Sequence, residues 1–350
     1  MNQTGVASTG SRRQAFRNRE LCTGLFADRD VEELAREGDE LFEPERLVAQ
    51  LGAQRLDFGS LRFVEVVVPG HDRDRRIRQA RDLANGAQEL EAAGQRHPQI
   101  EKPIESPEDI DRLKIFEPRE SLSHVLEAIG LIQGELAGRL PLIGFGGAPF
   151  TLASYAIEGG HSNNFARTKS LMYGHPEAWH RLCDTFATVI GDYMVAQIDA
   201  GVDAVQIFDS WVGTLSSADY REFALPHTQK IFQAIGGRVP TIHFGTGTAT
   251  ILEDLREAGG DVIGVDWRSP IDTAWDRIGH DHAVQGNLDP TLLLGPTARM
   301  FSQTDDILAR VGGRPGHIFN LGHGILPSTP VEHVQMLAQY VHSASRRNAT

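Results

Sequence analysis

The chain shows two regions of different hydrophobic pattern, and the division lies near residue 100. Beyond it, short runs that are apolar throughout alternate with longer amphipathic stretches. Short apolar runs are typical of strands that are buried on both faces. They predict strands at residues 140–144, 203–208, 239–244, 261–265, 282–285 and 317–320. The amphipathic stretches between them predict helices, for example at residues 164–173, 176–200 and 217–235.

Alternating strands and helices predict a parallel sheet. Six such units, with less regular ones upstream, approach the eight of a closed barrel more naturally than they fill an open sheet. We therefore expect an α/β fold that consists of a single (β/α)8 TIM barrel, with residues 1–350 forming one domain. The length of 350 residues and the apolar content of 40% suit one such barrel and its core.

Residues 1–100 carry a weaker pattern. Residues 61–68 indicate a strand that Pro69 ends, whereas residues 71–97 are highly charged and indicate an exposed helix or an insertion. We expect this divergent N-terminal segment to embellish the barrel domain rather than to fold as a second domain.

Charge and composition narrow the range of partners. The formal net charge of −13 argues against nucleic acid or an anionic membrane, because both bind basic patches. No run approaches the ~20 apolar residues of a membrane span, and the polar N-terminus lacks the apolar middle of a secretory signal. The two cysteines, Cys22 and Cys183, form no disulfide or metal pattern, which favours reduced thiols and a cytoplasmic location.

Polar and small residues follow four of the predicted strands, at residues 144–155, 209–211, 243–248 and 320–324. Barrels place their chemistry on the loops after the strands. Small residues in the first of these loops would let the backbone approach a ligand. Together the four segments indicate a barrel active site of unspecified chemistry, and the absence of a GxGxxG or GxxxxGK[ST] motif leaves nucleotide binding unsupported.

Each of these residues also has a structural interpretation. Taken alone, Tyr155 is typical of a packing residue, Ser210 of a helix N-cap and His243 of a satisfied interior histidine. His323 lies between two glycines, where nothing in its own segment packs around it. It is therefore the candidate for which a functional role is easiest to argue.

Five long segments carry a family resemblance. Residues 141–160, 206–216, 240–248, 264–270 and 319–330 resemble uroporphyrinogen decarboxylases in order and context, so the similarity covers the chain from about residue 100 onward. The resemblance implies a (β/α)8 barrel, a homodimer and catalysis without a cofactor or metal. It also implies the reaction, which removes the four acetate carboxyl groups of uroporphyrinogen III to give coproporphyrinogen III in porphyrin and heme biosynthesis.

Two motifs of this family have only approximate counterparts here. The family's Arg-Gln-Ala-Gly-Arg motif is nearest to residues 13–17, where Phe16 replaces the glycine, and its Phe-Ser-Asp motif is nearest to residues 63–65, where Glu65 replaces the aspartate. Either the N-terminal third has diverged or its reading frame is partly shifted. The resemblance implies that Glu65 is catalytic and that substrate is bound by Arg13, Gln14, Ala15, Phe16, Arg17, Tyr155, Ser210 and His323.

These residue types suit the chemistry that the resemblance implies. Arginine binds a carboxylate through two parallel hydrogen bonds, so Arg13 and Arg17 would also attract an anionic substrate to an acidic protein. Loss of CO2 from a pyrrole acetate follows protonation of the ring carbon, and a carboxylate such as that of Glu65 would stabilise the cationic pyrrole. Because a displacement of ~1 Å can cost about a hundredfold in rate, the extra methylene of Glu65 predicts reduced activity.

Two other functions are consistent with parts of the sequence. A related barrel methyltransferase would need zinc ligands in a His-x-Cys pattern and a later cysteine. Here Gly245 stands where that cysteine would be, and no cysteine follows Cys183. The altered residues Phe16 and Glu65 also agree with a catalytically impaired paralogue that binds tetrapyrroles without converting them.

Overall fold

The computed structural model describes residues 100, 102–160 and 162–347. Within them six strands form one parallel sheet in which each strand pairs with the next along the chain. The strands are β1 (Ile143–Gly147), β2 (Ala204–Asp209), β3 (Thr241–Gly245), β4 (Val262–Gly264), β5 (Ala283–Leu288) and β6 (His317–Leu321). Sequential order, parallel pairing and intervening helices are the architecture of a (β/α) barrel.

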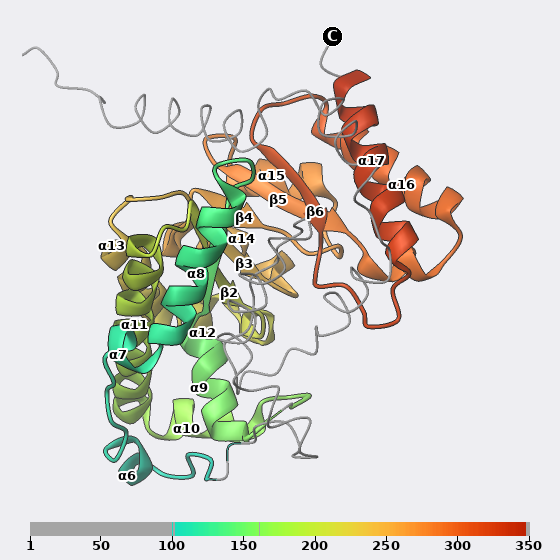
Figure 1. Cartoon of the computed structure of the whole chain (residues 1–350). Coiled ribbons are helices and arrows are strands. Elements are labelled where there is room, and N and C mark those ends of the chain that lie inside the picture. The colour runs from blue at the N-terminus through green and yellow to red at the C-terminus, as the bar shows by residue number, and fades with distance from the viewer. Residues whose placement is uncertain (1–99, 101, 161, 348–350) are drawn as a thin grey trace, which may run out of the picture.

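Helices separate the strands and cover the outer side of the sheet. Figure 1 shows α11 and α13 along one flank of the molecule and α16 and α17 along the other. The longer helices are α8 (Ser123–Leu136), α9 (Pro149–Glu158), α10 (Ala166–Gly174), α11 (Pro176–Asp199), α13 (Leu225–Ile235), α15 (Ile271–Ile278), α16 (Thr297–Val311) and α17 (Val331–Arg347). The shorter helices are α6 (Pro107–Ile110), α7 (Pro118–Ser121), α12 (Ser217–Phe223) and α14 (Leu252–Ala258), with 3-10 turns η1 (Val212–Thr214), η2 (Thr248–Thr250) and η3 (Pro290–Leu294).

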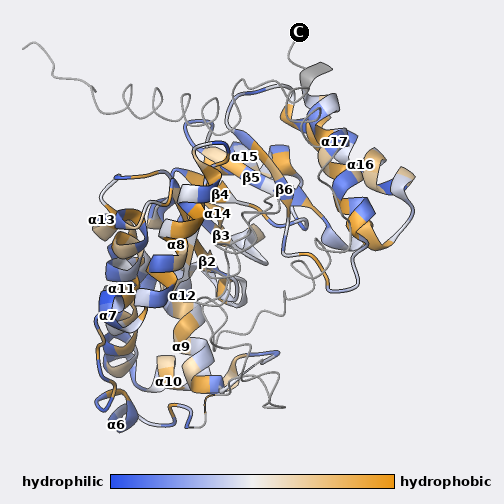
Figure 2. Ribbon diagram, in the orientation of Figure 1, coloured by the Kyte–Doolittle hydropathy of each residue, from blue (hydrophilic) through white to orange (hydrophobic). Residues whose placement is uncertain are grey.

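The main core lies between the sheet and these helices. The hydropathy colouring of Figure 2 shows apolar residues concentrated on the strands and on the helix faces turned toward them. Trp179 on α11 and Trp275 on α15 are buried, and their indole N–H groups donate to the backbone oxygens of Phe223 and His282, each at 2.9 Å. Burying an indole together with its hydrogen bond avoids the cost of an unpaired donor.

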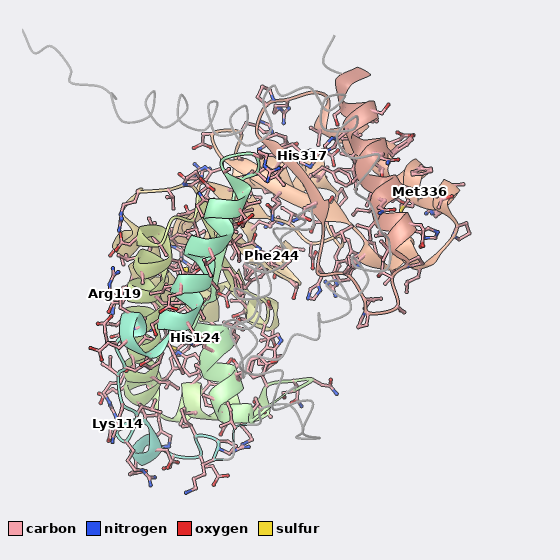
Figure 3. All side chains as sticks on the ribbon, viewed as in Figure 1. Lys114, Arg119, His124, Phe244, His317 and Met336 are labelled. Atoms are coloured by element: carbon pink, nitrogen blue, oxygen red, sulfur yellow. The ribbon has the colours of Figure 1, made fainter. Side chains whose placement is uncertain are left out.

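Three phenylalanines form a row across the first three strands. The rings of Phe145 and Phe208 meet edge to face with centroids 5.8 Å apart, and Phe208 meets Phe244 at 5.9 Å in the same way. Phe208 and Phe244 are register partners of β2 and β3, and Figure 3 labels Phe244 near the centre of the molecule. Phe208 and Phe244 each lie one residue before the end of their strand, so the row lies just below the carboxyl ends of β2 and β3.

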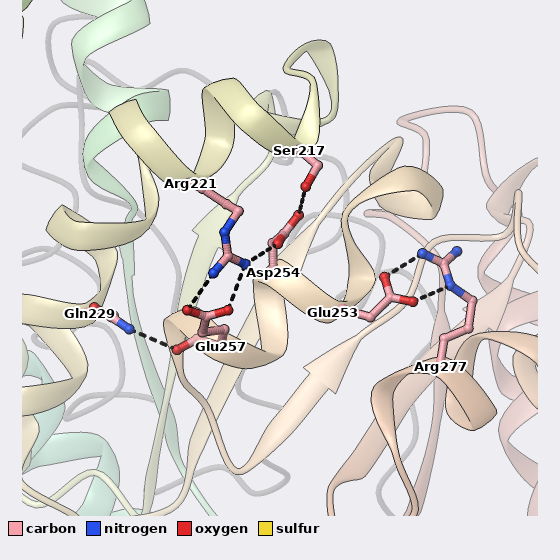
Figure 4. A network of polar contacts seen from close by, with 7 residues as sticks. All are labelled: Ser217, Arg221, Gln229, Glu253, Asp254, Glu257 and Arg277. Carbon is pink, nitrogen blue, oxygen red and sulfur yellow. Dashed lines mark hydrogen bonds and ion pairs between the residues drawn. The ribbon is translucent and has the colours of Figure 1, made fainter.

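Ion pairs join neighbouring helices on the outside. Figure 4 shows Arg221 of α12 bridging Asp254 and Glu257 of α14, with contacts of 2.7 Å to each. Arg277 of α15 pairs with Glu253 of α14 through two contacts of 2.7 and 2.5 Å. Because the partners form a network rather than isolated pairs, they favour a fixed packing of successive helices.

The six strands expected from the sequence are confirmed, with shifted ends. The largest shift is in the first strand, which was expected at 140–144 and lies at Ile143–Gly147. Leu140 is exposed, and the backbone N–H of Leu142 donates to the Asp203 side chain at 2.8 Å, so residues before 143 belong to the approach to the strand. The expected helix at 217–235 is divided at Ala224, because Pro226 in the first turn of α13 cannot continue a helix that precedes it.

The α/β class and the parallel barrel order are thus confirmed. Closure with eight strands, the charged insertion at 71–97 and a single domain over 1–350 stay predictions, because residues 1–99 lie outside the described residues. Within the described ranges, no helix combines the length and apolar character that would let it cross a membrane.

Candidate active site at the carboxyl ends of the strands

The strand β1 and the helix α9 together contain the glycine-rich segment that was expected to be a loop. Gly146 lies within β1, where an added Cβ would be 2.8 Å from the Cε atom of Met194. A Cβ on Gly144 would be 2.4 Å from the side-chain oxygen of Gln197, which accepts from the N–H of Phe145 at 3.0 Å. These two glycines therefore allow α11 to pack closely on the strand, whereas the expected approach of a ligand to the backbone of this segment stays a prediction.

Tyr155 lies on α9 rather than in a loop, because Pro149 starts the helix directly after the strand. Its ring stacks on that of Trp211 with centroids 4.1 Å apart and planes 19° apart. The Phe165 ring also packs against Trp211, with ring centroids 5.1 Å apart. Tyr155 is half-buried, so the stack fixes its ring while part of the side chain stays accessible.

Asp209 ends β2 and connects it to α9. Its carboxyl group is fully buried, and one oxygen accepts a hydrogen bond of 2.9 Å from the hydroxyl of Thr151. The same hydroxyl oxygen accepts a hydrogen bond of 3.4 Å from the backbone nitrogen of Trp211. The other carboxyl oxygen has no hydrogen-bond partner among the described residues.

Burial raises the pKa of Asp209 to about 7, and the hydrogen bond from Thr151 only partly offsets this effect. Burial favours the neutral form of a carboxyl group because the charged form loses its hydration. The buried carboxyl group of Asp209 therefore favours its protonated form below about pH 7. In the sequence, Asp209 directly follows the apolar run of a predicted strand, and no role was predicted for it. Its position directly at the end of an apolar run was the signal available.

Ser210 follows Asp209 and is half-buried. Its backbone oxygen accepts a hydrogen bond from the hydroxyl of Thr246, which joins the segment after β2 to the segment after β3. The alternative role as a helix N-cap is wrong, because Ser216 caps α12 by accepting from the N–H of Asp219 at 3.1 Å. The Ser210 hydroxyl is therefore not committed to a helix start.

His243 is an interior residue of β3, as the structural interpretation predicted, but it is only partly satisfied, because its buried Nε2 atom has no hydrogen-bond partner among the described residues. It is fully buried, and its Nδ1 atom lies 3.2 Å from the backbone oxygens of both Leu255 and Gly259. Burial lowers its pKa to about 4, so it is neutral near pH 7. In the described ranges no three His, Cys, Asp or Glu side chains are grouped as metal ligands. The geometry around His243 therefore gives no support to a zinc-dependent methyltransferase.

The segment after β4 is organised by Asp266, whose side chain is 1% exposed. One carboxylate oxygen accepts from the N–H of Gly247 at 2.6 Å and from the Arg268 guanidinium, and the other accepts from the N–H of Arg268 at 3.0 Å. From β5, the side-chain amide of Asn287 donates to the backbone oxygens of Asp266 and Ser269 at 2.9 and 2.6 Å. The carboxyl ends of β3, β4 and β5 are thus held together by buried polar groups.

His323 follows β6 and is half-buried. Its ring meets that of Trp267 edge to face, with centroids 6.4 Å apart. A Cβ on Gly322 would lie 2.5 Å from the backbone nitrogen of Trp267, so the two segments touch at backbone distance. His323 does have a packing partner, but that partner comes from the segment after β4 rather than from its own.

The described structure thus brings the predicted residues to one edge of the sheet in two groups. Tyr155 and Ser210 flank the contact between α9 and the end of β2, and His323 lies with Trp267 at the ends of β4 and β6. The remaining candidates lie outside the described residues, namely Arg13, Gln14, Ala15, Phe16, Arg17 and Glu65.

Comparisons with known proteins identify a family model that matches this chain and several proteins with similar sequences. The family model described as uroporphyrinogen decarboxylase matches residues 85–344. A uroporphyrinogen decarboxylase of Chloroflexus aurantiacus is 53% identical over 251 residues, which cover 70% of each chain. One of Sorangium cellulosum is 52% identical over 250 residues, covering 71% of this chain and 72% of the relative.

A solved methyltransferase structure from Methanosarcina mazei superposes with a TM-score of 0.58 at 22% identity, covering 69% of this chain and 70% of that one. At this identity the likeness shows a shared fold and nothing about the reaction.

Proposed function

Because the chain belongs to the uroporphyrinogen decarboxylase family, we propose that it converts uroporphyrinogen III to coproporphyrinogen III by removing CO2 from the four acetate side chains. The observation that carries this proposal is the match of residues 85–344 to the family. That range contains all six described strands and the segments at their carboxyl ends, including Tyr155, Ser210 and His323. The reaction belongs to porphyrin and heme biosynthesis.

The described side chains suit the recognition of a substrate with many carboxylates. The Tyr155 and Ser210 hydroxyls and the His323 imidazole can each donate a hydrogen bond, and hydrogen bonds to charged acceptors are the stronger ones. All three lie at the carboxyl edge of the sheet, where barrel enzymes bind their substrates. We assign them to substrate carboxylates rather than to the ring carbon that is protonated.

In this proposal, residues of the N-terminal segment supply the charged groups that the mechanism needs. Arg13 and Arg17 would bind acetate or propionate groups, with Gln14, Ala15 and Phe16 lining the same site. The Glu65 carboxylate would accept the pyrrole N–H groups and stabilise the cation that forms when the ring carbon is protonated. As CO2 leaves, the electron pair of the broken carbon–carbon bond would pass into this cationic ring. The exocyclic CH2 would then take up a proton to become a methyl group, and the ring carbon would release the proton that it had gained.

We further propose that the protein works in the cytoplasm as a homodimer without a cofactor. Buried, unbonded Cys183 agrees with a reducing compartment. The charge of −13 argues against nucleic acid or an anionic membrane as a partner.

The test is to incubate the purified full-length protein anaerobically with uroporphyrinogen III and to separate the oxidised products by their number of carboxyl groups. We expect the eight-carboxylate substrate to give way to the four-carboxylate product, with the same rate after treatment with a chelator. Recovery of only the eight-carboxylate species, with binding retained, would instead support the tetrapyrrole-binding paralogue that Phe16 and Glu65 suggest.

A further inference from the structure

Arg268 stands out among the cations at the carboxyl edge of the sheet. It follows β4, and its side chain is 51% exposed although it contacts Asp266, whose side chain is 1% exposed. The buried carboxylate thus lies beneath a guanidinium that reaches solvent.

The guanidinium is held in a fixed orientation. Its Nη1 atom contacts Asp266, and its central carbon lies 4.1 Å from the centre of the Trp267 ring. Stacking on an aromatic face leaves the edge of the planar group free to donate. Within the described ranges, neither Nε nor Nη2 of Arg268 makes a hydrogen bond. Two donors on a rigid fork are therefore available to a ligand.

Trp267 also connects this fork to His323, since the His323 ring meets the same indole edge to face at 6.4 Å. Arg268 and His323 come from the segments after β4 and β6, respectively, and they share one indole as their support. The arrangement presents a cation and an imidazole on one short stretch of surface. A carboxylate is the group that such donors recognise, because a guanidinium fork matches its two oxygens.

We propose that Arg268 is a substrate-binding residue that holds a peripheral carboxylate of the tetrapyrrole next to His323. This inference rests on the proposed function and adds a cation from the described part of the chain to those expected from the N-terminal segment. Arg268 would also supply local positive charge, because a protein with net charge −13 must concentrate positive charge where an anion binds.

The test compares steady-state constants for uroporphyrinogen III between the wild-type protein, R268Q and R314Q. Arg314 is the matched control, because its guanidinium also lies over an indole, that of Trp275 at 5.1 Å, but at the opposite edge of the sheet, before β6. We expect R268Q to raise KM about tenfold with kcat changed less than twofold, as for loss of one charged hydrogen bond at a half-exposed site. R314Q should leave both constants unchanged.

A third variant separates binding from structural support. R268K keeps a positive charge beside Asp266 but lacks the planar fork that donates two parallel hydrogen bonds to a carboxylate. If Arg268 binds substrate, KM rises in R268K as well as in R268Q, while the free energy of unfolding of R268K stays close to that of the wild-type protein. If the pair only supports the segment after β4, R268K has the KM of the wild-type protein, and that result overturns the proposal. Should R268Q fail to fold, R268K decides the question by its KM.

The outcomes are distinct from those that test the proposed function. An active wild-type protein whose KM is unchanged by R268Q refutes the role of Arg268 alone. A wild-type protein that releases no CO2 refutes the proposed function, whatever the variants do.

Discussion

Tyr155 stacks on Trp211 with ring centroids 4.1 Å apart and planes 19° apart, so a helix residue and the segment after β2 form one unit. The backbone N–H of Trp211 donates to the Thr151 hydroxyl, and that hydroxyl donates to the buried Asp209 carboxyl group. The orientation of the Tyr155 ring therefore depends on a contact chain that begins at a carboxyl group inside the protein.

Replacing Trp211 by Leu is expected to lower kcat/KM for uroporphyrinogen III by about fivefold, because stacked aromatic pairs contribute ~1 kcal/mol. Y155F removes only the hydroxyl, and a tenfold to hundredfold loss is expected from about 1.5–3 kcal/mol. If Trp211 acts by holding that hydroxyl, adding W211L to Y155F costs less than about twofold more.

The control for this cycle is F301L. Phe301 stacks on Tyr340 at 4.3 Å and 23° on the outer helices, so its loss removes a similar stack away from the site. F301L should leave kcat/KM unchanged. Fully additive losses in W211L and Y155F would contradict the positioning role of Trp211.

Asp209 should make folding stability depend on pH. Burial raises its pKa from 3.8 to about 7, so between these values the folded protein holds a proton that the unfolded chain releases. Stability from this group is full below about pH 4 and declines as pH rises to about 7, by up to ~1.4 kcal/mol per pH unit. D209N should remove this contribution, because the amide oxygen still accepts from Thr151 but does not titrate.

The measurement is urea unfolding of the wild-type protein and D209N from pH 4.5 to 8. The buried His243, with its pKa lowered to about 4, has the opposite effect, since stability from it is lost as pH falls below ~6.5. It acts equally in both proteins, so their difference in stability isolates Asp209. A difference that does not change with pH would show that Asp209 is charged throughout.

Gly322 is expected to tolerate no side chain. A Cβ at this position would lie 2.5 Å from the backbone nitrogen of Trp267, and a backbone atom cannot move aside as a flexible side chain can. G322A should therefore lower the free energy of unfolding by ~2 kcal/mol, typical of overpacking. G324A is the matched control, because a Cβ on Gly324 meets nothing within 4 Å. Equal stabilities for the two variants would contradict the close approach of the segments after β4 and β6.

Glu65 gives a prediction from the sequence alone. If its carboxylate stabilises the cationic pyrrole from one methylene too far away, E65D should raise kcat, by up to about a hundredfold. E65Q should reduce kcat, because it removes one preorganised charge, and such a charge stabilises the transition state by a few kcal/mol. Wild-type turnover by E65Q would remove this carboxylate from the mechanism.

The sequence revealed the strands well because their burial on both faces gives uninterrupted apolar runs. It misplaced the start of β1, because glycines that serve packing against Met194 and Gln197 resemble those of a ligand loop. It named Tyr155, Ser210 and His323 as candidates, and each of them contacts a residue from another segment that no local pattern reveals. The contact between Trp267 and His323 depends on the meeting of two segments that are more than 50 residues apart.

The most direct test of the proposed activity follows the carboxyl carbons of the substrate. Uroporphyrinogen III labelled with ¹³C in its acetate carboxyl groups is incubated anaerobically with the purified full-length protein, and labelled CO2 is counted against tetrapyrrole. We predict four labelled CO2 molecules for each coproporphyrinogen formed, with the propionate carboxyl groups retained. Labelled substrate recovered intact from the protein, with no labelled CO2, would contradict the assignment.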